Sequence, residues 1–292
     1  MPAEDFSLDS ALIRRRFSTS ASRAHENDFV AREISSRMAE RLDYIRIAPK
    51  RILDLGCGHG ADLPMLAQRY PEAQRIALDC ALPLLARAEP DAGFFKRLLG
   101  KRAAPHLVCA DALQLPLARA SVEFVWSNLL LNWLSDPMDA LREAHRVLAV
   151  DGLLMFSTLG PDTLRELREA MPGPPGARVH RFIDMHDLGD CLVQAGFADP
   201  VMDMQTLTLT YPDANALFAE LKASASSSAS TSRPRGLTGP RTWQNVRERL
   251  ERMRHQGRIP ATLEIVFGHA WKPAPKTLED GRAIIRFKPR PG

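Results

Sequence analysis

Residues 51–60 read RILDLGCGHG, an apolar run that passes directly into a GxGxG turn. The apolar run predicts a buried strand, and Gly56, Gly58 and Gly60 predict a tight turn in a conformation that glycine adopts easily. In open α/β sheets such a turn lies at the carboxyl edge, where ligands bind. The glycines alone would fit a dinucleotide equally well.

Three carboxylates extend this pattern. Asp54 precedes the glycines, where it can face the amino end of a ligand or orient the turn, and a diphosphate would be repelled there. Asp79 ends the next predicted strand, where a carboxylate can accept both hydroxyls of a ribose. Asp111 follows a third strand and can accept from an adenine amino group. Each alone also fits a cap or turn, but together they predict a cofactor site.

Strand-like and helix-like segments alternate over residues 51–158. This alternation predicts parallel strands joined by right-handed crossovers, a doubly wound and mostly parallel α/β sheet of the Rossmann-like kind. An amphipathic helix is expected over residues 29–45, before the first strand. We expect four parts: an N-terminal helical segment 1–48, a cofactor-binding core 49–160, the rest of the sheet with a helical substrate cap 161–272, and a tail 273–292.

The third part is less regular. A helix closed by Gly196 precedes strand-like residues 201–211, and a further helix is expected over 212–222. The low-complexity stretch ASASSSASTS begins a segment, residues 223–239, that we expect to be a flexible loop. A last strand is expected over residues 262–271.

Composition places few other constraints. Apolar residues form 45% and charged residues 25% of 292, as in ordinary globular proteins. No apolar run approaches the roughly 18 residues of a membrane span, and the first residues lack a secretory signal. We therefore expect a cytoplasmic protein with no membrane contact. No RNA-binding module is recognisable, so no nucleic-acid partner is expected.

The four cysteines are far apart and form no CxxC pair. Neither a metal site nor a disulfide framework is expected from them. Cys57, Cys80 and Cys109 fall in or beside predicted strands, where we expect buried thiols, and Cys191 is expected to be buried too.

The net charge of +4 is unevenly distributed. Residues 241–258 contain six arginines and two glutamates. Such a segment fits either an acidic partner or a solvated helix face.

Four segments resemble the class I S-adenosylmethionine-dependent methyltransferases: LDLGCGHG (53–60), ALD (77–79), CADALQLPL (109–117) and FVWSNLLLNWLSDPMDALREAHRVLAVDGLLMFSTLG (124–160). WSNLLLNWLSD, FSTLGPDTLREL, HRFIDMHDLGDCLVQAGF and LEIVFGHAW are more specific. They are similar to the malonyl-[acyl-carrier protein] O-methyltransferases of biotin synthesis over nearly the whole chain. Relatives of that family include mitochondrial complex-I assembly factors.

The resemblance implies S-adenosylmethionine as cofactor and assigns residues to it. Those residues are Asp54, Gly56, Gly58 and Gly60 near the methionine part, Asp79 at the ribose, Asp111 and Ala112 at the adenine, and Asn128 and Leu129 at the methyl-transfer position. The chain departs from the family at Ala24, seven residues after Phe17, where relatives usually have a tyrosine. This difference bears on activity and on the choice of substrate.

The expected chemistry needs alignment more than proton transfer. A free carboxylate is ionised at neutral pH, so its O-methylation needs no general base. Asn128 and Trp133 are candidates for positioning the substrate, and Trp126 and Trp133 either wall the pocket or pack in the core. Arg181 is the first candidate to orient the substrate carboxylate, with surface placement as the alternative.

Other polar residues are weaker candidates. Arg233 and Arg235 lie in the segment expected to be flexible. His180, His186 and His269 more often have structural or solvent-exposed roles, and no proton transfer here requires them.

Three functional hypotheses follow. The first is a carboxyl O-methyltransferase for malonyl-acyl carrier protein, with the acidic carrier docking on residues 241–258. The second is a degenerate assembly factor that keeps the fold, suggested by Ala24. The third is a methyltransferase for another small carboxylate or a quinone precursor.

Overall fold

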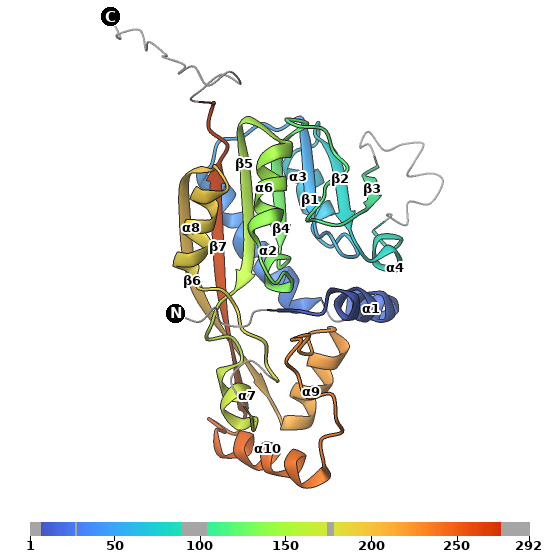
Figure 1. Ribbon diagram of the computed structural model, residues 1–292, viewed down its shortest axis with the longest axis vertical. Helices are drawn as coiled ribbons and strands as arrows, with labels where there is room; N and C mark the ends of the chain where they lie inside the picture. The colour runs from blue at the N-terminus through green and yellow to red at the C-terminus, as the bar shows by residue number, and fades with distance from the viewer. Residues whose placement is uncertain (1–6, 27, 89–103, 174–177, 276–292) are drawn as a thin grey trace, which may run out of the picture.

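The computed structural model describes residues 7–26, 28–88, 104–173 and 178–275. Within these residues the strands form one seven-stranded sheet in the order β3-β2-β1-β4-β5-β7-β6 (Figure 1). The strands are β1 (Arg51–Leu55), β2 (Gln74–Asp79), β3 (His106–Cys109), β4 (Val122–Asn128), β5 (Leu148–Leu159), β6 (Ala198–Tyr211) and β7 (Ile259–Trp271). Strands β1 to β5 pair in parallel, and β7 pairs antiparallel with both β5 and β6. The predicted doubly wound α/β class is confirmed.

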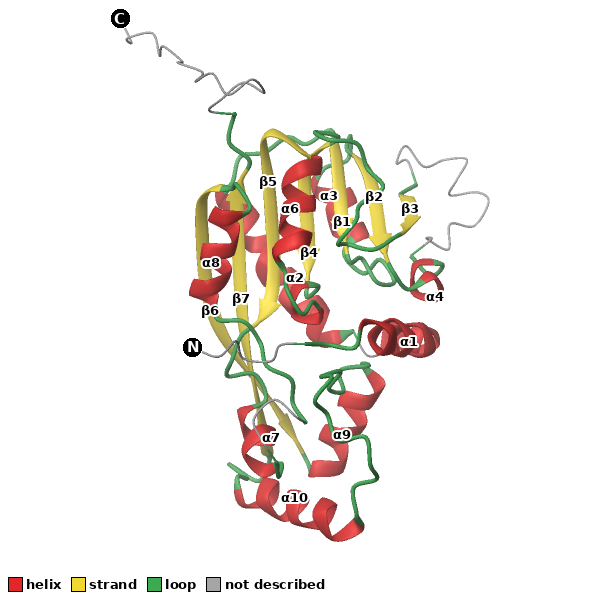
Figure 2. Cartoon of the chain, viewed as in Figure 1, coloured by secondary structure: helices red, strands yellow, loops and turns green. Residues whose placement is uncertain are grey.

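Helices cover both faces of this sheet (Figure 2). On one face α2 (Phe29–Arg41) and α3 (Leu63–Arg69) bury their apolar side chains with Trp126 and Met155. On the other face α6 (Met138–Val147) and α8 (Met185–Gln194) pack on Val125 and Leu154. Burial of apolar side chains on both faces explains why the central strands read as continuous apolar runs.

Helix α6 illustrates how the sequence specifies these elements. Its buried residues Ala140, Leu141, Ala144 and Val147 recur at intervals of three or four and form one stripe. At α8 the side chain of Asp184 accepts from the backbone N–H of His186 and caps the helix. Gly196 follows α8 with φ +99°, as its predicted role in closing the helix requires.

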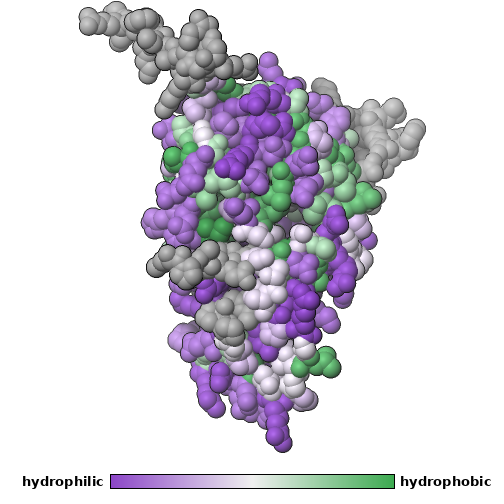
Figure 3. Space-filling model, in the orientation of Figure 1, coloured by the Kyte–Doolittle hydropathy of each residue, from purple (hydrophilic) through white to green (hydrophobic). Residues whose placement is uncertain are grey.

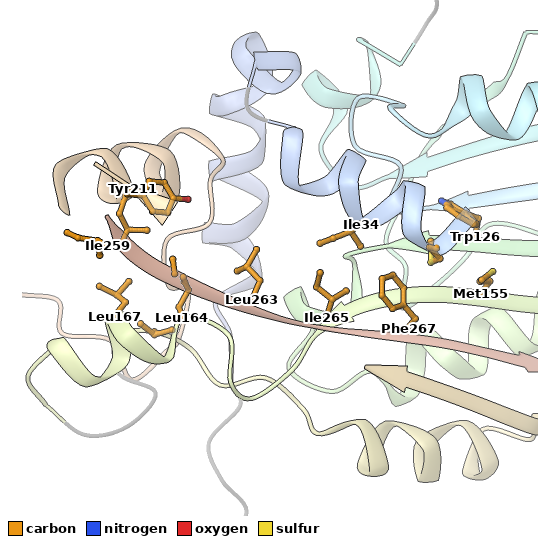
Figure 4. Close-up of a cluster of buried hydrophobic side chains, with 14 of the residues drawn as sticks. Ile34, Trp126, Met155, Leu164, Leu167, Tyr211, Ile259, Leu263, Ile265 and Phe267 are labelled. Carbon is orange, nitrogen blue, oxygen red and sulfur yellow. The ribbon is translucent and has the colours of Figure 1, made fainter. Parts of the chain in front are cut away.

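Strands β6 and β7 continue beyond the other strands into a second group of helices, α7 (Arg165–Ala170), α9 (Ala214–Ala223) and α10 (Pro240–Arg252) (Figure 1). One apolar cluster follows β7 from Phe267, beside Trp126, to Ile259, beside Tyr211 and Leu167 (Figure 4). We call α7, α9 and α10 with the ends of β6 and β7 the cap. Because its core continues the sheet's core, the cap is held at a fixed place next to the sheet.

Helix α1 (Ser10–Ser20) and the turn η1 (Ala21–Glu26) lie between the carboxyl edge of the sheet and the cap (Figure 1). Leu12 and Ile13 pack on Ala229, which is fully buried. Arg16 donates to the carbonyls of Ser227 and Ser228 at 2.6 and 2.9 Å. The serine-rich segment, expected from composition to be a flexible loop, thus has ordered partners on α1. The other secondary-structure elements in the described residues are η2 (Leu42–Tyr44), α4 (Leu82–Leu85) and η3 (Leu131–Trp133).

Candidate functional site

The glycine turn after β1 is held open toward a cavity. Gly56, Gly58 and Gly60 have φ values of +79°, +57° and +79°, which residues with a Cβ adopt only with strain. The Asp79 carboxylate accepts from the backbone N–H of Gly58 at 2.9 Å and of Ala81 at 2.8 Å. A Cβ on Gly58 would meet no atom within 4 Å. The end of β2 therefore fixes the turn, and one side of the turn stays free for a ligand.

Two buried carboxylates lie beneath this turn. Asp54 is 2% exposed, and its Oδ2 has no hydrogen-bond partner among the described residues. Burial, together with the nearby charges of Asp62 and Asp79, raises the pKa of Asp54 well above its usual range. Asp62 accepts from Trp126 Nε1 at 2.7 Å, and burial raises its pKa as well. Asp62 is thus satisfied by its donors, whereas among the described residues one oxygen of Asp54 is left without a donor.

A cavity of about 780 Å³ joins this turn to the cap. At the turn it is lined by the residues predicted from the sequence: Asp54, Gly56, Gly58, Asp79, Asp111, Ala112, Asn128 and Leu129. At the other end it is lined by cap residues that include Tyr211, Phe218, Leu221 and Trp243. One continuous space can therefore hold both a cofactor and a second molecule. Gly60 is outside this lining, since a Cβ there would instead collide with Leu63 and Ala88 at 2.8 Å.

Asn128 and Leu129 line the cavity and are held in place by hydrogen bonds. Asn128 donates from Nδ2 to the carbonyl of Ala31 at 3.0 Å and accepts from Ser157 Oγ at 2.7 Å. Leu129 has φ +58° and donates its N–H to the carbonyl of Ser157 at 3.1 Å. These bonds connect Asn128 and Leu129 to α2 and β5, so the polar atoms of both residues are fixed before any ligand enters.

The two tryptophans have different positions. Trp126 is fully buried in the core between the sheet and α2, so core packing is the correct alternative for it. Trp133 lines the cavity, and its ring makes edge contacts with Phe17 at 5.1 Å and His180 at 5.4 Å between centroids. Of these two tryptophans, Trp133 is therefore the one that can contact a substrate.

The cavity wall near Trp133 includes His180 but not Arg181. Val179, His180 and Phe182 line the cavity, whereas Arg181 lies outside the lining. His180 is 5% exposed, and its Nδ1 has no hydrogen-bond partner among the described residues. Burial and the nearby Arg16 lower the pKa of His180 to about 4, so the ring is neutral at neutral pH.

The remaining candidate cations and histidines lie elsewhere. Arg233 pairs with Asp9 at 3.1 Å, and neither Arg233 nor Arg235 lines the cavity. His186 is exposed beside Asp184, and His269 lies on β7 outside the lining. The structural or exposed roles expected for these two histidines agree with their positions.

The cysteines correct one expectation. Cys57, Cys80 and Cys109 line the cavity, and Cys80 and Cys109 are exposed rather than buried. They sit at strand ends that open on the cavity, where a strand no longer has helices on both faces. Cys191 on α8 is only partly buried.

Several cavity residues are absent from the candidates that the sequence provided. Asp62 lines the cavity and comes two residues after Gly60. From the sequence, an aspartate at this position indicates only a helix cap. Arg14 and Arg178 line the cavity from α1 and from the segment before His180. Tyr211 is hydrogen-bonded to Glu220 in the cap, and burial followed by the Glu220 charge raises its pKa. No local pattern brings these residues together, because distant segments supply them.

Comparison with known proteins agrees with this geometry. A family model described as a methyltransferase domain matches residues 53–156. A malonyl-[acyl-carrier protein] O-methyltransferase from Laribacter hongkongensis is 50% identical, over 98% of each chain. A protein of the same name from Gallionella capsiferriformans is 46% identical, over 97% of each chain. The chain belongs to this methyltransferase family.

Solved structures of more distant proteins share the fold. The YcgJ protein from Bacillus subtilis matches with a TM-score of 0.55 at 15% identity, over 82% of this chain and 98% of that one. The cyclase SpnF matches with a TM-score of 0.51 at 20% identity, over 83% and 82% of the two chains. Since a cyclase shares the fold, the architecture alone does not specify the reaction. In the described residues, no helix is long and apolar enough to cross a membrane.

S-adenosylmethionine is the cofactor of this methyltransferase, and the residues at the glycine turn fit it. The cofactor carries an ammonium group and a sulfonium, and Asp54 offers a buried carboxylate oxygen that no described residue satisfies. A nearby cation favours the ionised form of such a carboxylate. The fit is therefore electrostatic as well as steric.

Replacing Asp54 with Asn tests this electrostatic fit. The pKa of Asp54 is higher in the folded than in the unfolded protein. Such a carboxyl group destabilises the folded protein increasingly as the pH rises above the pKa of the unfolded state. Asp54→Asn removes that destabilisation, so without cofactor it should be more stable than the wild type by about 1–3 kcal/mol. Its melting temperature should also fall less between pH 5 and pH 8, while its cofactor affinity drops about tenfold or more. Calorimetric melting and titration measure both effects.

Asp136→Asn is the control, because Asp136 is exposed outside the cavity and accepts from the Met138 N–H in a turn that Asn also forms. A lower melting temperature for Asp54→Asn than for the wild type at pH 8 would contradict the account.

Proposed function

We propose that the chain transfers a methyl group to the free carboxylate of malonyl-acyl carrier protein, forming its methyl ester in biotin synthesis. The observation that carries this proposal is the 50% identity, over nearly the full length of both chains, to a protein named for that reaction. The cavity supports it, because the cofactor turn and the cap share one space. A cytoplasmic location stays a prediction.

The residues at the turn are assigned by their positions. The glycine turn and Asp54 would hold the methionine end of the cofactor. Asp79, which already orients Gly58, would hold the ribose. Asp111 and Ala112, after β3, would hold the adenine. Each assignment uses a group that the fold places at the carboxyl edge of the sheet.

The cofactor supplies a methyl group on a positively charged sulfur. The chain has to bring a carboxylate oxygen into line with it and to exclude water. Asn128 and Leu129 provide fixed positions in the cavity wall, and Trp133 provides an apolar part of that wall. An apolar wall favours this reaction because the two opposite charges cancel as the bond forms. No side chain has to accept a proton.

His180 replaces Arg181 as our candidate for contacting the substrate. It lines the cavity next to Trp133, and its Nδ1 lacks a partner among the described residues. A neutral imidazole can hydrogen-bond a carboxylate or thioester oxygen without neutralising the nucleophile as an arginine would. The low pKa of His180, about 4, keeps the ring in that state.

Ala24 motivates the alternative functions. Its small side chain packs with Ala21, Ala81 and Leu84, beside the strand end that carries Asp79. The tyrosine that the family resemblance implies there would be much larger, so we expect the packing beside this strand end to differ, while Ala24 itself lies outside the cavity lining. An assembly factor that keeps the fold, or a methyltransferase for another small carboxylate or a quinone precursor, would fit this difference.

Two basic surfaces are candidates for docking an acidic carrier protein. One is the arginine-rich segment 241–258, whose six arginines are all exposed at the end of the cap, in a largely hydrophilic region of the surface (Figure 3). The other, which we call the α1 rim, consists of Arg15, Arg16, Arg233 and Arg235 near Asp9, together with Arg14 on the same helix. Arg14 itself lines the cavity. We propose the α1 rim as the docking surface, because it adjoins the cavity.

Methyl transfer with purified components tests the function. Labelled methyl from S-adenosylmethionine should appear on malonyl-acyl carrier protein in a base-labile form, and unloaded carrier protein should stay unlabelled. Malonyl-coenzyme A, run alongside, shows whether the carrier is required. Absence of label despite measurable cofactor binding would reject this function and favour the alternatives that Ala24 suggests.

Charge reversal distinguishes the two docking surfaces. Arg15→Glu with Arg235→Glu, two exposed arginines outside the cavity lining, should lower kcat/KM for malonyl-acyl carrier protein about tenfold or more at low salt, because the on-rate depends on complementary charge. The matched pair Arg241→Glu with Arg252→Glu should change it little. Malonyl-pantetheine, which lacks the acidic protein, should be used equally well by all variants. A loss confined to the α10 pair would place docking on residues 241–258 instead.

A further inference from the structure

Three potential metal ligands meet beside the glycine turn. His25 lies on η1, Asp28 directly precedes α2, and His59 is part of the turn itself. Their ligand atoms all lie within 4.8 Å of one another. His59 Nε2 is 2.9 Å from Asp28 Oδ2, and the ring centroids of His25 and His59 are 4.3 Å apart. None of the three has a role in the proposed methyl transfer.

The donor types suit one class of ion. Two imidazoles and one carboxylate, with a position left for water, are a common ligand set for Zn²⁺. With bonds of about 2.0–2.2 Å, tetrahedral ligand atoms lie roughly 3.3 Å apart, so the cluster needs only a small contraction. The side chains of Asp28 and His59 are 9% and 10% exposed and are already held together. His25 is exposed and can turn to complete the set.

Charges around the cluster allow ligation. Burial lowers the pKa of His59, although its bond to Asp28 acts in the opposite direction, and a neutral imidazole is the form that binds metal. Arg32 is the competing cation, since its Nε lies 2.6 Å from the same Asp28 Oδ2. The Arg32 side chain is 54% exposed, so solvent can receive it when an ion takes its place.

We propose that His25, Asp28 and His59 form a binding site for a divalent transition-metal ion of the Zn²⁺ class, with Arg32 displaced on binding. The ion joins η1 and the start of α2 to the glycine turn. It therefore stabilises the contact between the N-terminal segment and the cofactor site. The proposal is independent of the substrate, because it uses no residue assigned to the acyl group.

Titration of the full chain with Co²⁺, whose visible absorption reports nitrogen ligation, tests the site. Saturation at one ion per chain and displacement by Zn²⁺ are expected. His25→Ala should weaken binding about tenfold or more, because it removes one protein ligand. Arg32→Gln should tighten binding, because it removes the competing cation. The opposite changes, or no saturable binding, would overturn the proposal.

The matched control is His186→Ala. His186 is also an exposed histidine beside an aspartate, with its Nδ1 2.8 Å from Asp184, but it belongs to no such three-residue cluster in the described chain. This variant should bind Co²⁺ as the wild type does. Zn²⁺ should also raise the melting temperature of the wild type and of His186→Ala, and at the same Zn²⁺ concentration it should raise that of His25→Ala clearly less. An equal rise in all three proteins would show adventitious binding and reject the site.

Discussion

The constraint on which the site depends is the burial of carboxylates at the carboxyl edge of a parallel sheet. Asp54 is buried without a hydrogen-bond partner for Oδ2 among the described residues, and Asp62 and Asp79 lie close enough to raise its pKa further. Such an arrangement costs stability when no cation is present. The cost is tolerable only because seven strands and the helices on both faces fix the surrounding backbone. We propose that the positively charged cofactor converts this cost into affinity.

The second determinant is the length of β6 and β7. These strands pair from Ala198 with Trp271 to Tyr211 with Ile259, well past the end of β5. Their far ends carry the cap, and one apolar cluster runs along β7 from the sheet into it (Figure 4). The cap therefore faces the cofactor turn across a cavity of defined shape. A fold that otherwise serves many reactions acquires its own substrate space in this way.

The sequence predicted the parts of the site that depend on local pattern. A strand, a glycine turn and acidic residues at strand ends indicate a cofactor edge, and Asp54, Asp79 and Asp111 all line the cavity. It predicted less well what tertiary packing decides. Arg181 was the first candidate to orient the substrate carboxylate, but Val179, His180 and Phe182 line the cavity and Arg181 does not, which no local sequence pattern indicates. The low-complexity composition of residues 223–232 likewise gave no indication that Ala229 packs on α1.

The account can be tested most directly by measuring the protons exchanged when S-adenosylmethionine binds, using calorimetry in buffers of different ionisation enthalpy. A carboxyl group with a raised pKa is partly protonated in the free protein, and a bound cation favours its ionised form. Binding near neutral pH should therefore release protons to the buffer, and Asp54→Asn should release fewer. Proton uptake, or the same release from Asp54→Asn as from the wild type, would contradict the claim that a strained buried carboxylate receives the cofactor.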